Sequence, residues 1–494
     1  MDLFELLVVL FLAVVAWFHF LRSDSGKRPP GPYPFPIVGN IFQLGRNPHH
    51  SLAKLSKTFG PLMSLKLGST YAIVVSSSEI AKEILQKNDS VFSGRFNPVA
   101  VHAHDHHKTS VTCLPPGNQW KKLRKICKEQ LFSTHRLDAS QGLREANLQK
   151  LSEYVQKCCD SGREVNIGEA AFITMLNLMS ATLFSSEFTN FDSDTNQEIK
   201  ETFHGVMKYV GVPNISDFIP IFKLIDPQGI ERKAEFYLGK LLSIIEDIIN
   251  QRLKSRGASL DYQKKNDLLE TLLDLSEGSE YDLSTNEIQH LLLDLMIAGS
   301  DTTASATEWT MTELLLNPEK LSKAKHELRT VIGQNKQIQE SDISKLPYLE
   351  ATIKEVIRLH PPAPLLAPHK SEGQAQVSGY IIPKDTRVLI NAWAIHREPS
   401  LWPNPNSFEP ERFLDKNISF RGQDFELIPF GSGRRICPGL PLANRMLHAL
   451  VVTLIQNFDW KFEVGAEGED AHREEEFGLS VQKAIPLKAT PIKL

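Results

Sequence analysis

A ten-residue stretch around one cysteine has the clearest chemical signal in the chain. Residues 430–439 read FGSGRRICPG, and a helical pattern follows from Leu442. Two glycines allow a tight backbone that brings peptide N–H groups toward the sulfur of Cys437, and the start of the helix adds partial positive charge there. Both effects favour a thiolate over a thiol, and the thiolate is the form that binds metal ions. A lone cysteine is usually a buried structural residue, so this interpretation depends on the whole stretch.

An acid and a hydroxyl stand side by side in a second segment. Residues 298–303 read AGSDTT and lie inside a very long predicted helix, which a capping box at residues 284–287 starts and Pro318 ends. Glycine and hydroxyl residues in the middle of a helix favour a local opening of its hydrogen-bond ladder. Asp301 and Thr302 can then pass protons to a bound ligand. The alternative is a polar patch on the surface.

Two pairs of residues have the spacing that places side chains on one face of a helix. Glu355 and Arg358 lie about one turn apart, where they can pair. Taken alone, such a pair is most often an exposed salt bridge of little energetic value. Trp120 and Arg124 are four residues apart, so an indole N–H and a guanidinium lie on the same face. Taken alone, these two fit an ordinary amphipathic helix.

These segments together resemble the cytochrome P450 family. The spacing Phe-x-x-Gly-x-Arg-x-Cys-x-Gly of residues 430–439 matches the haem loop of that family. The resemblance implies that Cys437 is the ligand of the iron of haem b, and Arg435 can pair with an acidic haem substituent. Hydrogen bonds to the sulfur would tune the electron density that reaches bound oxygen.

A second match concerns Glu355 and Arg358, which resemble the family's Glu-x-x-Arg motif. Residues 408–413, FEPERF, resemble the segment that contributes the third member, here Arg412. The resemblance implies a buried network of these three side chains that holds the scaffold on the haem side.

Further matches complete the expected haem site. Trp120 and Arg124 resemble the family's Trp-x-x-x-Arg helix, whose two end residues reach a haem propionate. His369 stands where relatives have Arg or His near the same propionates. Asp301 and Thr302 resemble the family's acid and threonine pair, which we expect to deliver protons. The expected cofactor-binding residues are Trp120, Arg124, His369, Phe430, Arg435, Cys437 and Gly439.

The resemblance is closest to plant microsomal enzymes of the geraniol hydroxylase and ferruginol synthase group of terpenoid oxidases. Residues 172–184, FITMLNLMSATLF, and residues 430–445 are similar to that group. The resemblance implies an NADPH- and O2-dependent monooxygenase that hydroxylates a hydrophobic terpenoid in plant specialised metabolism, a diterpenoid in preference to a monoterpenol. An apolar pocket agrees with this, because such a pocket binds mainly by burying hydrocarbon. Its expected residues are Phe96, Val99, Val101, Ala298, Ala363, Leu365, Leu366 and Leu479.

Electrons for such a reaction must come from a partner. No dinucleotide fingerprint occurs in the chain, so NADPH is expected to bind an NADPH-cytochrome P450 reductase. The lysines at positions 121, 122, 125 and 128 form either a docking surface for this acidic flavoprotein or a solvated face. Two rival functions are a reductase-independent haem-thiolate isomerase or dehydratase, against which Asp301 and Thr302 argue, and a haem sensor. A net charge of −4 and a pI near 6.5 argue against a nucleic-acid partner.

The elements that must position these residues are mostly helices. Residues 62–67 and 71–75 predict two strands of a small hairpin sheet, and short strand signals return at 376–377 and 386–390. Most of the chain up to residue 359 otherwise has helical periodicity. We expect a mainly α protein with a minor β region. The resemblance implies the cytochrome P450 fold, with the haem between the long central helix and the cysteine loop.

Two polar segments contain the residue types of a metal site but are expected to be loops. His102, His104, His106 and His107 match no standard ligand spacing. The resemblance implies instead a flexible loop over the substrate pocket there. The acidic stretch 467–476 is expected to be a solvated loop.

The N-terminal residues predict a membrane anchor. Residues 3–21 are apolar with two exceptions, close to the ~20 residues needed to span a bilayer. Positive charges follow this run, which disfavours a cleaved signal peptide and places the body on the cytoplasmic side. We therefore expect an anchor over residues 1–22, a proline-rich hinge over 23–40 and one catalytic domain over 41–494, held at the endoplasmic reticulum membrane. Five cysteines do not suggest a disulfide framework, in agreement with a reducing compartment.

Overall fold

The description rests on a computed structural model of the full chain. It describes residues 28–191, 195–258, 262–278, 281–333, 339–465 and 468–493, together with Glu5, Val8, Val9, Phe11 and Leu12 near the N-terminus. Most of the predicted anchor and the first residues of the predicted hinge therefore lie outside the described residues, and both stay predictions.

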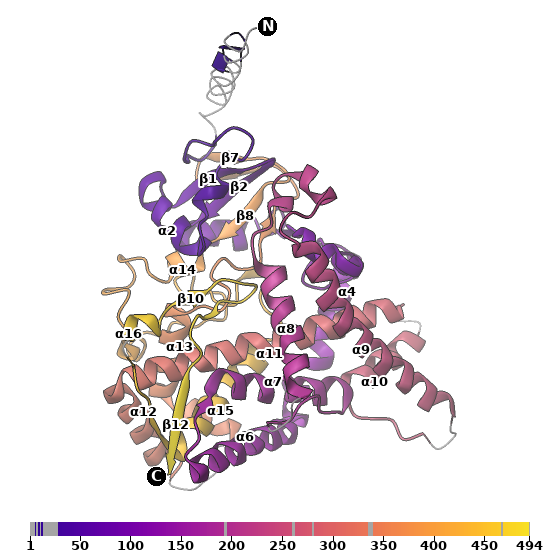
Figure 1. The fold of residues 1–494 in the computed structure, drawn as a ribbon, viewed down its shortest axis with the longest axis vertical. Coiled ribbons are helices and arrows are strands. Elements are labelled where there is room, and N and C mark those ends of the chain that lie inside the picture. The colour runs from indigo at the N-terminus through magenta and orange to yellow at the C-terminus, as the bar shows by residue number, and fades with distance from the viewer. Residues whose placement is uncertain are drawn as a thin grey trace.

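Helices form most of the body, and the larger sheet lies at one end of it (Figure 1). The longer helices are α2 (Pro48–Phe59), α4 (Asn118–Ile126), α6 (Gln141–Ser161), α7 (Ile167–Phe184), α8 (Thr195–Gly211), α9 (Ile230–Ala258), α10 (Leu268–Glu277), α11 (Thr285–Leu316), α12 (Pro318–Val331), α13 (Pro347–Leu359) and α15 (Leu440–Gln456). Short helices are α3 (Ser78–Lys82), α5 (Thr134–Ala139), α14 (Ala392–Ile395) and α16 (Gly468–Ala471). The predicted mainly α class with a minor β region is confirmed.

Helix α11 crosses the whole body and is its central element (Figure 1). Its first turn is closed by the predicted capping box, in which the N–H of Glu287 donates to Ser284 Oγ at 3.2 Å and the N–H of Ser284 donates to Glu287 Oε2 at 3.0 Å. The helix ends at Leu316, because Pro318 starts α12. Its 32 residues correspond to a length of roughly 48 Å. Helices α7, α9, α13 and α15 pack against it.

Within the described residues, the strands form one five-stranded sheet and three smaller ones. They are β1 (Leu62–Leu67), β2 (Thr70–Val75), β3 (Gly94–Arg95), β4 (Val165–Asn166), β5 (His369–Lys370), β6 (Ala375–Val377), β7 (Tyr380–Ile382), β8 (Arg387–Ile390), β9 (Phe458–Lys461), β10 (Glu475–Glu476), β11 (Gln482–Lys483) and β12 (Lys488–Lys493). The order in the larger sheet is β1-β2-β8-β5-β3, with β1 and β2 antiparallel and β2 and β8 parallel. The predicted hairpin is confirmed, and the pairing of β3 with β5 places Arg95 opposite His369.

The described part of the predicted hinge is bonded to the first strand. The N–H of Ser64 donates to the carbonyl of Pro30 at 2.8 Å, and Gly39 forms a bridge with Leu67. Asn40 donates from its side chain to the carbonyl of Tyr33 at 3.1 Å. Residues 30–40 therefore continue the folded body and do not form a free spacer.

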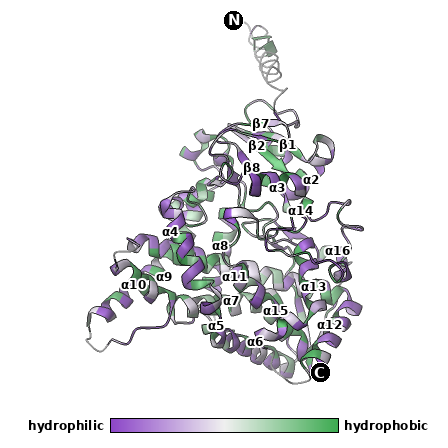
Figure 2. Ribbon diagram, turned by 180° about the vertical axis from the view of Figure 1, so that it is seen from behind, coloured by the Kyte–Doolittle hydropathy of each residue, from purple (hydrophilic) through white to green (hydrophobic). Residues whose placement is uncertain are grey.

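Helix α7 is the only described helix that is long and apolar enough to cross a membrane, and 72% of it is buried inside the fold. It packs along α11 and belongs to the main hydrophobic core. Peripheral helices such as α6 and α12 instead carry hydrophilic and hydrophobic residues together (Figure 2). Helix α7 is therefore a core helix of the body.

Candidate active site

Two neighbouring cavities lie between α11 and the loops at the C-terminal end of the chain. The inner cavity, of about 350 Å³, is bounded by α11, α15 and residues 429–439. The outer cavity, of about 340 Å³, is bounded by α8, by residues 95–98 and by residues 363–368 and 477–479. Ala298, Thr302, Ala363 and Leu366 are among the residues that line both. The two cavities therefore share a wall, and both lie within or near the range typical of small-molecule sites.

Cys437 lies at the wall of the inner cavity, directly before α15. Its N–H donates to the carbonyl of Phe430 at 2.9 Å, which closes the loop between these residues. Its sulfur accepts hydrogen bonds from the N–H groups of Gly439 and Leu440, at the start of α15. The structure thus brings Phe430, Cys437 and Gly439 together at one cavity.

Opposing effects act on the pKa of this thiol. Burial raises the pKa of Cys437 above its ordinary value, although the N–H of Gly439, the charge of Arg124 and the N–H of Leu440 each lower it. The helix start therefore acts in the expected direction, but burial outweighs it. A metal ion bound at the sulfur supplies the charge that removes the proton.

The two glycines of this loop differ in what holds them. Both have positive φ, 71° at Gly431 and 65° at Gly433. A Cβ at Gly433 would lie 2.1 Å from the carbonyl oxygen of Leu85, whereas one at Gly431 would meet only Leu366 Cδ1 at 3.9 Å. Gly433 is thus required both for its conformation and for close backbone approach.

We expect Gly433→Ala to lower the stability of the haem-loaded protein by more than the ~1–3 kcal/mol that backbone strain alone costs. Gly431→Ala should show the strain alone and is the matched control. Thermal unfolding followed by haem absorbance measures both. Equal losses in the two variants would contradict the role of the Leu85 contact.

Positive charge gathers at one end of the inner cavity. Arg124 on α4, Arg435 before Cys437 and Arg95 on β3 all line it, as do Trp120 and His369. The guanidinium of Arg435 lies 4.3 Å from the ring centroid of Trp120. His369 Nδ1 lies 2.7 Å from the carbonyl of Phe92, which leaves the other ring nitrogen for a different partner.

The three arginines form no ion pair with any described residue and bond only to backbone carbonyls. Arg435 donates to the carbonyls of Ser93 and Leu114, and Arg124 donates to that of Ile436. Burial and then the neighbouring Arg95 and Arg124 lower the pKa of Arg435 to about 9.

Arg95 is the member of this cluster that has no motif in the sequence. Its Nη1 donates to the carbonyl of Ala367 at 2.7 Å, but its buried Nε has no hydrogen-bond partner. Burial lowers the pKa of Arg95 to about 10. Three guanidiniums around apolar walls fit a flat ligand that carries two carboxylates, and haem b is such a ligand.

The segment of α11 at the cavities is an unbroken helix. Gly299, Thr302 and Ala306 line the inner cavity, and Gly299 allows the close approach of Met179 on α7. The hydroxyl of Thr302 donates to the carbonyl of Ala298 at 2.8 Å. The expected local opening is not found in the described helix, although this hydroxyl bonds to a backbone carbonyl as the residue types suggested.

Asp301 and Thr302 point in different directions. Thr302 lines both cavities, whereas Asp301 lines neither. The carboxylate of Asp301 accepts hydrogen bonds from Ser480 and from Gln482 Nε2, the latter at 2.7 Å. Burial raises the pKa of Asp301. Asp301 is thus buried against the C-terminal loop. It does not belong to a polar surface patch, and it does not contact either cavity.

Most of the expected substrate pocket lines the outer cavity. This set consists of Phe96, Val101, Ala298, Ala363, Leu365, Leu366 and Leu479. Val99 is a correction: it lines neither cavity, because its side chain is buried elsewhere and its N–H donates to Asp217 at 2.6 Å. Helix α8 adds Val206, Met207 and Val210, which no motif marked.

The histidine-rich segment covers the outer cavity as helical turns, η3 (Val99–Lys108). His106 lines that cavity, and its Nδ1 lies 2.8 Å from Nδ1 of His290 on α11. Its Nε2 lies 3.2 Å from Asp294, which also accepts from the hydroxyl of Ser110 at 2.8 Å. These contacts give the segment a structural role, and its expected place over the pocket agrees with the structure.

Glu355, Arg358 and Arg412 form one network. Arg358 Nε donates to Glu355 Oε2 at 2.6 Å, and Arg412 Nε donates to Glu355 Oε1 at 2.9 Å. The side chains of Glu355 and Arg358 are fully buried. Arg358 Nη1 also donates to the carbonyls of His396 and Pro405, at 2.8 and 2.7 Å. The alternative of an exposed salt bridge is therefore wrong.

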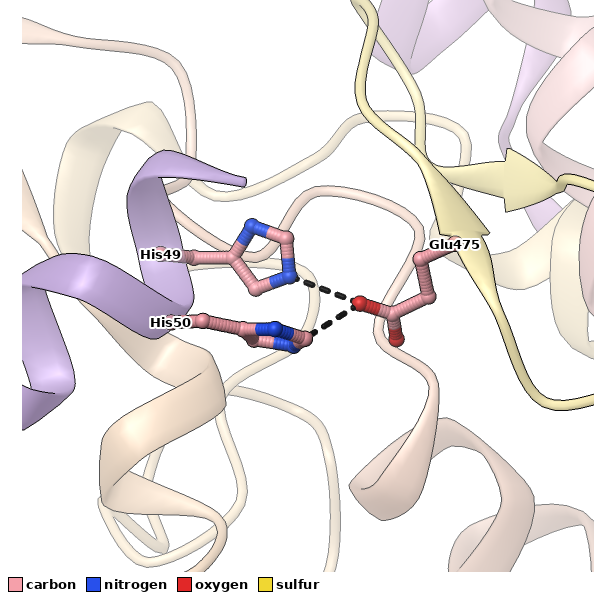
Figure 3. Close-up of side chains that lie close together, drawn as sticks. All are labelled: His49, His50 and Glu475. Atoms are coloured by element: carbon pink, nitrogen blue, oxygen red, sulfur yellow. Dashed lines mark hydrogen bonds and ion pairs between the residues drawn. The ribbon is translucent and has the colours of Figure 1, made fainter. Parts of the chain in front are cut away.

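The acidic stretch 467–476 is not solvated throughout, which corrects the expectation for Glu475. One of its carboxylate oxygens lies 2.8 Å from His49 Nε2 and 3.0 Å from His50 Nε2 (Figure 3). His49 is fully buried, and the side chain of Glu475 is only 6% exposed. Burial raises the pKa of Glu475, but hydrogen bonds from His360, His49 and His50 outweigh it and hold that pKa below its ordinary value.

Comparison with known proteins agrees with this geometry. The cytochrome P450 family matches residues 29–487. Carnosic acid synthase from Rosmarinus officinalis is 55% identical over 99% of this chain and 100% of the relative. Ferruginol synthase from Isodon rubescens is 54% identical over 100% of each chain. 11-Hydroxysugiol 20-monooxygenase from Salvia miltiorrhiza is 53% identical over 99% of this chain and 100% of the relative.

Proposed function

The chain belongs to the cytochrome P450 family, and we propose that this monooxygenase hydroxylates a diterpenoid in plant specialised metabolism. The observation that carries the proposal is the outer cavity, which is largely apolar and shares a wall with the cavity beside Cys437. The names of relatives that are 53–55% identical over nearly the whole chain support the diterpenoid class. A rigid hydrocarbon gains binding energy there mainly through burial of its apolar surface.

Haem b bound through Cys437 supplies the activation of dioxygen and the transfer of one oxygen atom to carbon. The residues of the chain bind the haem and keep water away from the reaction site. Arg95, Arg124 and Arg435 are placed to bind the two haem carboxylates, since they line the same cavity without another ion-pair partner among the described residues. The apolar walls exclude water from the reacting carbon.

Thr302 is the hydroxyl placed to hold a proton at the reaction site. It lines both cavities, and its Oγ can keep its bond to Ala298 while it accepts a bond from a ligand. Asp301 would act from behind the helix, through Ser480 and Gln482, and not by direct contact. The role of both residues in proton delivery is part of the proposal.

We expect Thr302→Ala to lower product formation by about 10²-fold, the lower end of what a side chain positioned for proton transfer contributes. Haem content and the carbon monoxide band should stay unchanged, because the variant leaves the Cys437 loop intact. Product is measured with reductase and NADPH supplied. A haem sensor would form no product in either protein, and turnover without NADPH would favour the isomerase or dehydratase.

NADPH would act through a reductase that docks near α4. Lys121, Lys125 and Lys128 are exposed there, whereas Lys122 is partly used by an ion pair with Glu287 at 2.9 Å. This exposed basic surface suits an acidic flavoprotein, and Lys121 and Lys125 lie on the helix that also carries Arg124.

We place the catalytic domain on the cytosolic face of the endoplasmic reticulum membrane. The apolar run within residues 1–22 and the charges after it support a single anchor. Val9, Phe11 and Leu12 are exposed apolar residues of that run. The domain limits, with the anchor over 1–22, the hinge over 23–40 and the catalytic domain over 41–494, belong to the same proposal.

A substrate panel tests the diterpenoid assignment. Microsomes that contain this chain, reductase and NADPH are incubated with mono-, sesqui- and diterpenoids, and products are identified by mass spectrometry. We expect oxygenated products mainly from diterpenoids. Preferential oxidation of monoterpenols such as geraniol would overturn the assignment and favour the alternative hydroxylase.

A further inference from the structure

Arg387 is a partly buried cation in the wall of the largely apolar outer cavity. It is the first residue of β8, the central strand of the larger sheet, and its side chain lines the outer cavity. The guanidinium carbon lies 4.2 Å from the ring centroid of Phe96 and 5.6 Å from that of Phe218. Two aromatic faces therefore fix its position, which keeps the charge within the cavity wall.

The N–H groups of this guanidinium lack partners among the described residues. Nε and Nη1 of Arg387 are buried and have no hydrogen-bond partner. Of the described arginines that line either cavity, Arg95, Arg124 and Arg435 all donate to carbonyls, whereas no hydrogen bond of the Arg387 side chain is found. A buried donor of a charged group is costly when it is unsatisfied, so such a group calls for an acceptor.

Asp217 does not satisfy the N–H groups of Arg387. Asp217, from the short helical turn η5 (Ile215–Asp217), lines the same cavity but lies outside ion-pair distance, and its carboxylate accepts from the N–H of Val99. Burial lowers the pKa of Arg387 to about 10, against the charge of Asp217, so Arg387 is a cation at neutral pH. Asp217 therefore offsets part of the charge of Arg387 but accepts no hydrogen bond from it.

We propose that Arg387 binds an oxygen atom that the substrate already carries, so that the preferred substrate is an oxygenated diterpenoid and not the bare hydrocarbon. This inference rests on the proposed diterpenoid function. A hydroxyl, a ketone or a carboxylate oxygen can each accept from Arg387, and the carboxylate adds charge attraction. The substrate must then come from an earlier oxidation of the hydrocarbon skeleton.

Binding at this point also orients the substrate. Thr302 and Ala298 belong to the walls of both cavities, so a molecule held at Arg387 can extend toward the inner cavity. A rigid polycyclic skeleton fixed at one oxygen presents a defined carbon to the reaction site. Burial of hydrocarbon alone discriminates poorly between related skeletons, so the polar contact supplies the selectivity.

The test uses the haem-loaded full chain and three tricyclic diterpenes that share one skeleton and bear a methyl, a hydroxymethyl or a carboxylate group at one position. Binding is measured from the shift of haem absorbance. We expect the parent to bind the oxygenated probes about ten- to a hundred-fold more tightly than the hydrocarbon, the range for a hydrogen bond to a charged group. Arg387→Met should remove this preference and leave hydrocarbon binding within about two-fold, since methionine retains an apolar side chain of similar length.

Two further variants complete the design. Arg387→Lys should restore part of the preference because it returns a cation, and Arg232→Met, at an exposed arginine of α9, should change nothing. Equal loss for all three probes in Arg387→Met would show a structural role only, and an unchanged preference would exclude Arg387; either result overturns the inference while the diterpenoid function stands. Failure of the parent to oxidise any diterpenoid in the substrate panel would overturn the function itself.

Discussion

Replacement of Cys437 by serine is expected to abolish product formation and to remove the long-wavelength Soret band of the reduced carbon monoxide complex. Serine has nearly the same volume but supplies a poor ligand for haem iron, because its hydroxyl is not ionised at neutral pH and oxygen is a harder donor than sulfur. Loss of even an outer partner of a metal ligand typically costs about 10- to 100-fold in activity, so loss of the ligand itself should cost more.

The variant is best compared with Cys159→Ser. Cys159 is a partly exposed thiol near the end of α6 and lines neither cavity. The control should keep both the band and the activity of the parent. Because the Cys437 loop is closed by a backbone bond to Phe430, we expect Cys437→Ser to fold and to give a shorter-wavelength band. A preparation of that variant which retains the long-wavelength band would exclude Cys437 as the ligand.

The features that could be predicted are those encoded within a few consecutive residues. The loop around Cys437 is a fixed pattern of ten residues, and the start of α11 is a capping box of four. Such patterns specify backbone geometry locally, so they do not depend on the rest of the fold. The same holds for the hairpin of β1 and β2, whose strands are adjacent in the chain.

Arg95 and Arg387 could not be predicted as cavity residues, because their positions depend on strand order. Arg95 reaches the inner cavity, beside Arg124 and Arg435, only because β3 pairs with β5 and places it opposite His369. Arg387 reaches the outer cavity because β8 lies between β2 and β5. No local pattern around either arginine indicates these pairings.

The surroundings of Asp301 and Glu475 depend on the fold for a related reason. Neighbouring residues of a helix point about 100° apart, so Thr302 cannot face the cavities with Asp301 beside it. A run of acidic residues indicates solvent exposure unless cations or histidines from elsewhere surround one of them. His49 and His50 are more than 400 residues away from Glu475 along the chain, and only the folded structure brings them to it (Figure 3).

Arg358→Met is expected to cause the largest loss of stability of any substitution considered, by about 3–5 kcal/mol, the cost of removing one partner of a buried ion pair. Glu355 would stay fully buried with Arg412 as its remaining cation. The carbonyls of His396 and Pro405 would lose their donor at the same time. Thermal unfolding of the haem-loaded protein, followed by absorbance and circular dichroism, measures the loss.

The same substitution should also disturb the cysteine loop. The carbonyl of His396 accepts from Arg358, and Nε2 of the same histidine accepts from the N–H of Ile428 at 3.0 Å. Burial lowers the pKa of His396 to about 3, so its ring is neutral and can accept this bond at any ordinary pH. Ile428 lies two residues before the loop 430–439. Loss of the network of Glu355, Arg358 and Arg412 is therefore transmitted to the Cys437 loop through the side chain of His396. We therefore expect the long-wavelength band to weaken along with stability.

Two further variants distinguish an effect on the Cys437 loop through His396 from a general loss of stability. Arg358→Lys keeps the charge but loses the planar fork, so it should fall between the parent and Arg358→Met in both stability and band intensity. Lys264→Met breaks an exposed ion pair with Asp274 and should cost less than about 1 kcal/mol. If Arg358→Met unfolds at the same temperature as Lys264→Met, the network of Glu355, Arg358 and Arg412 does not hold the haem side of the fold. A destabilised Arg358→Met that keeps the full band would instead exclude His396 as the link to Cys437.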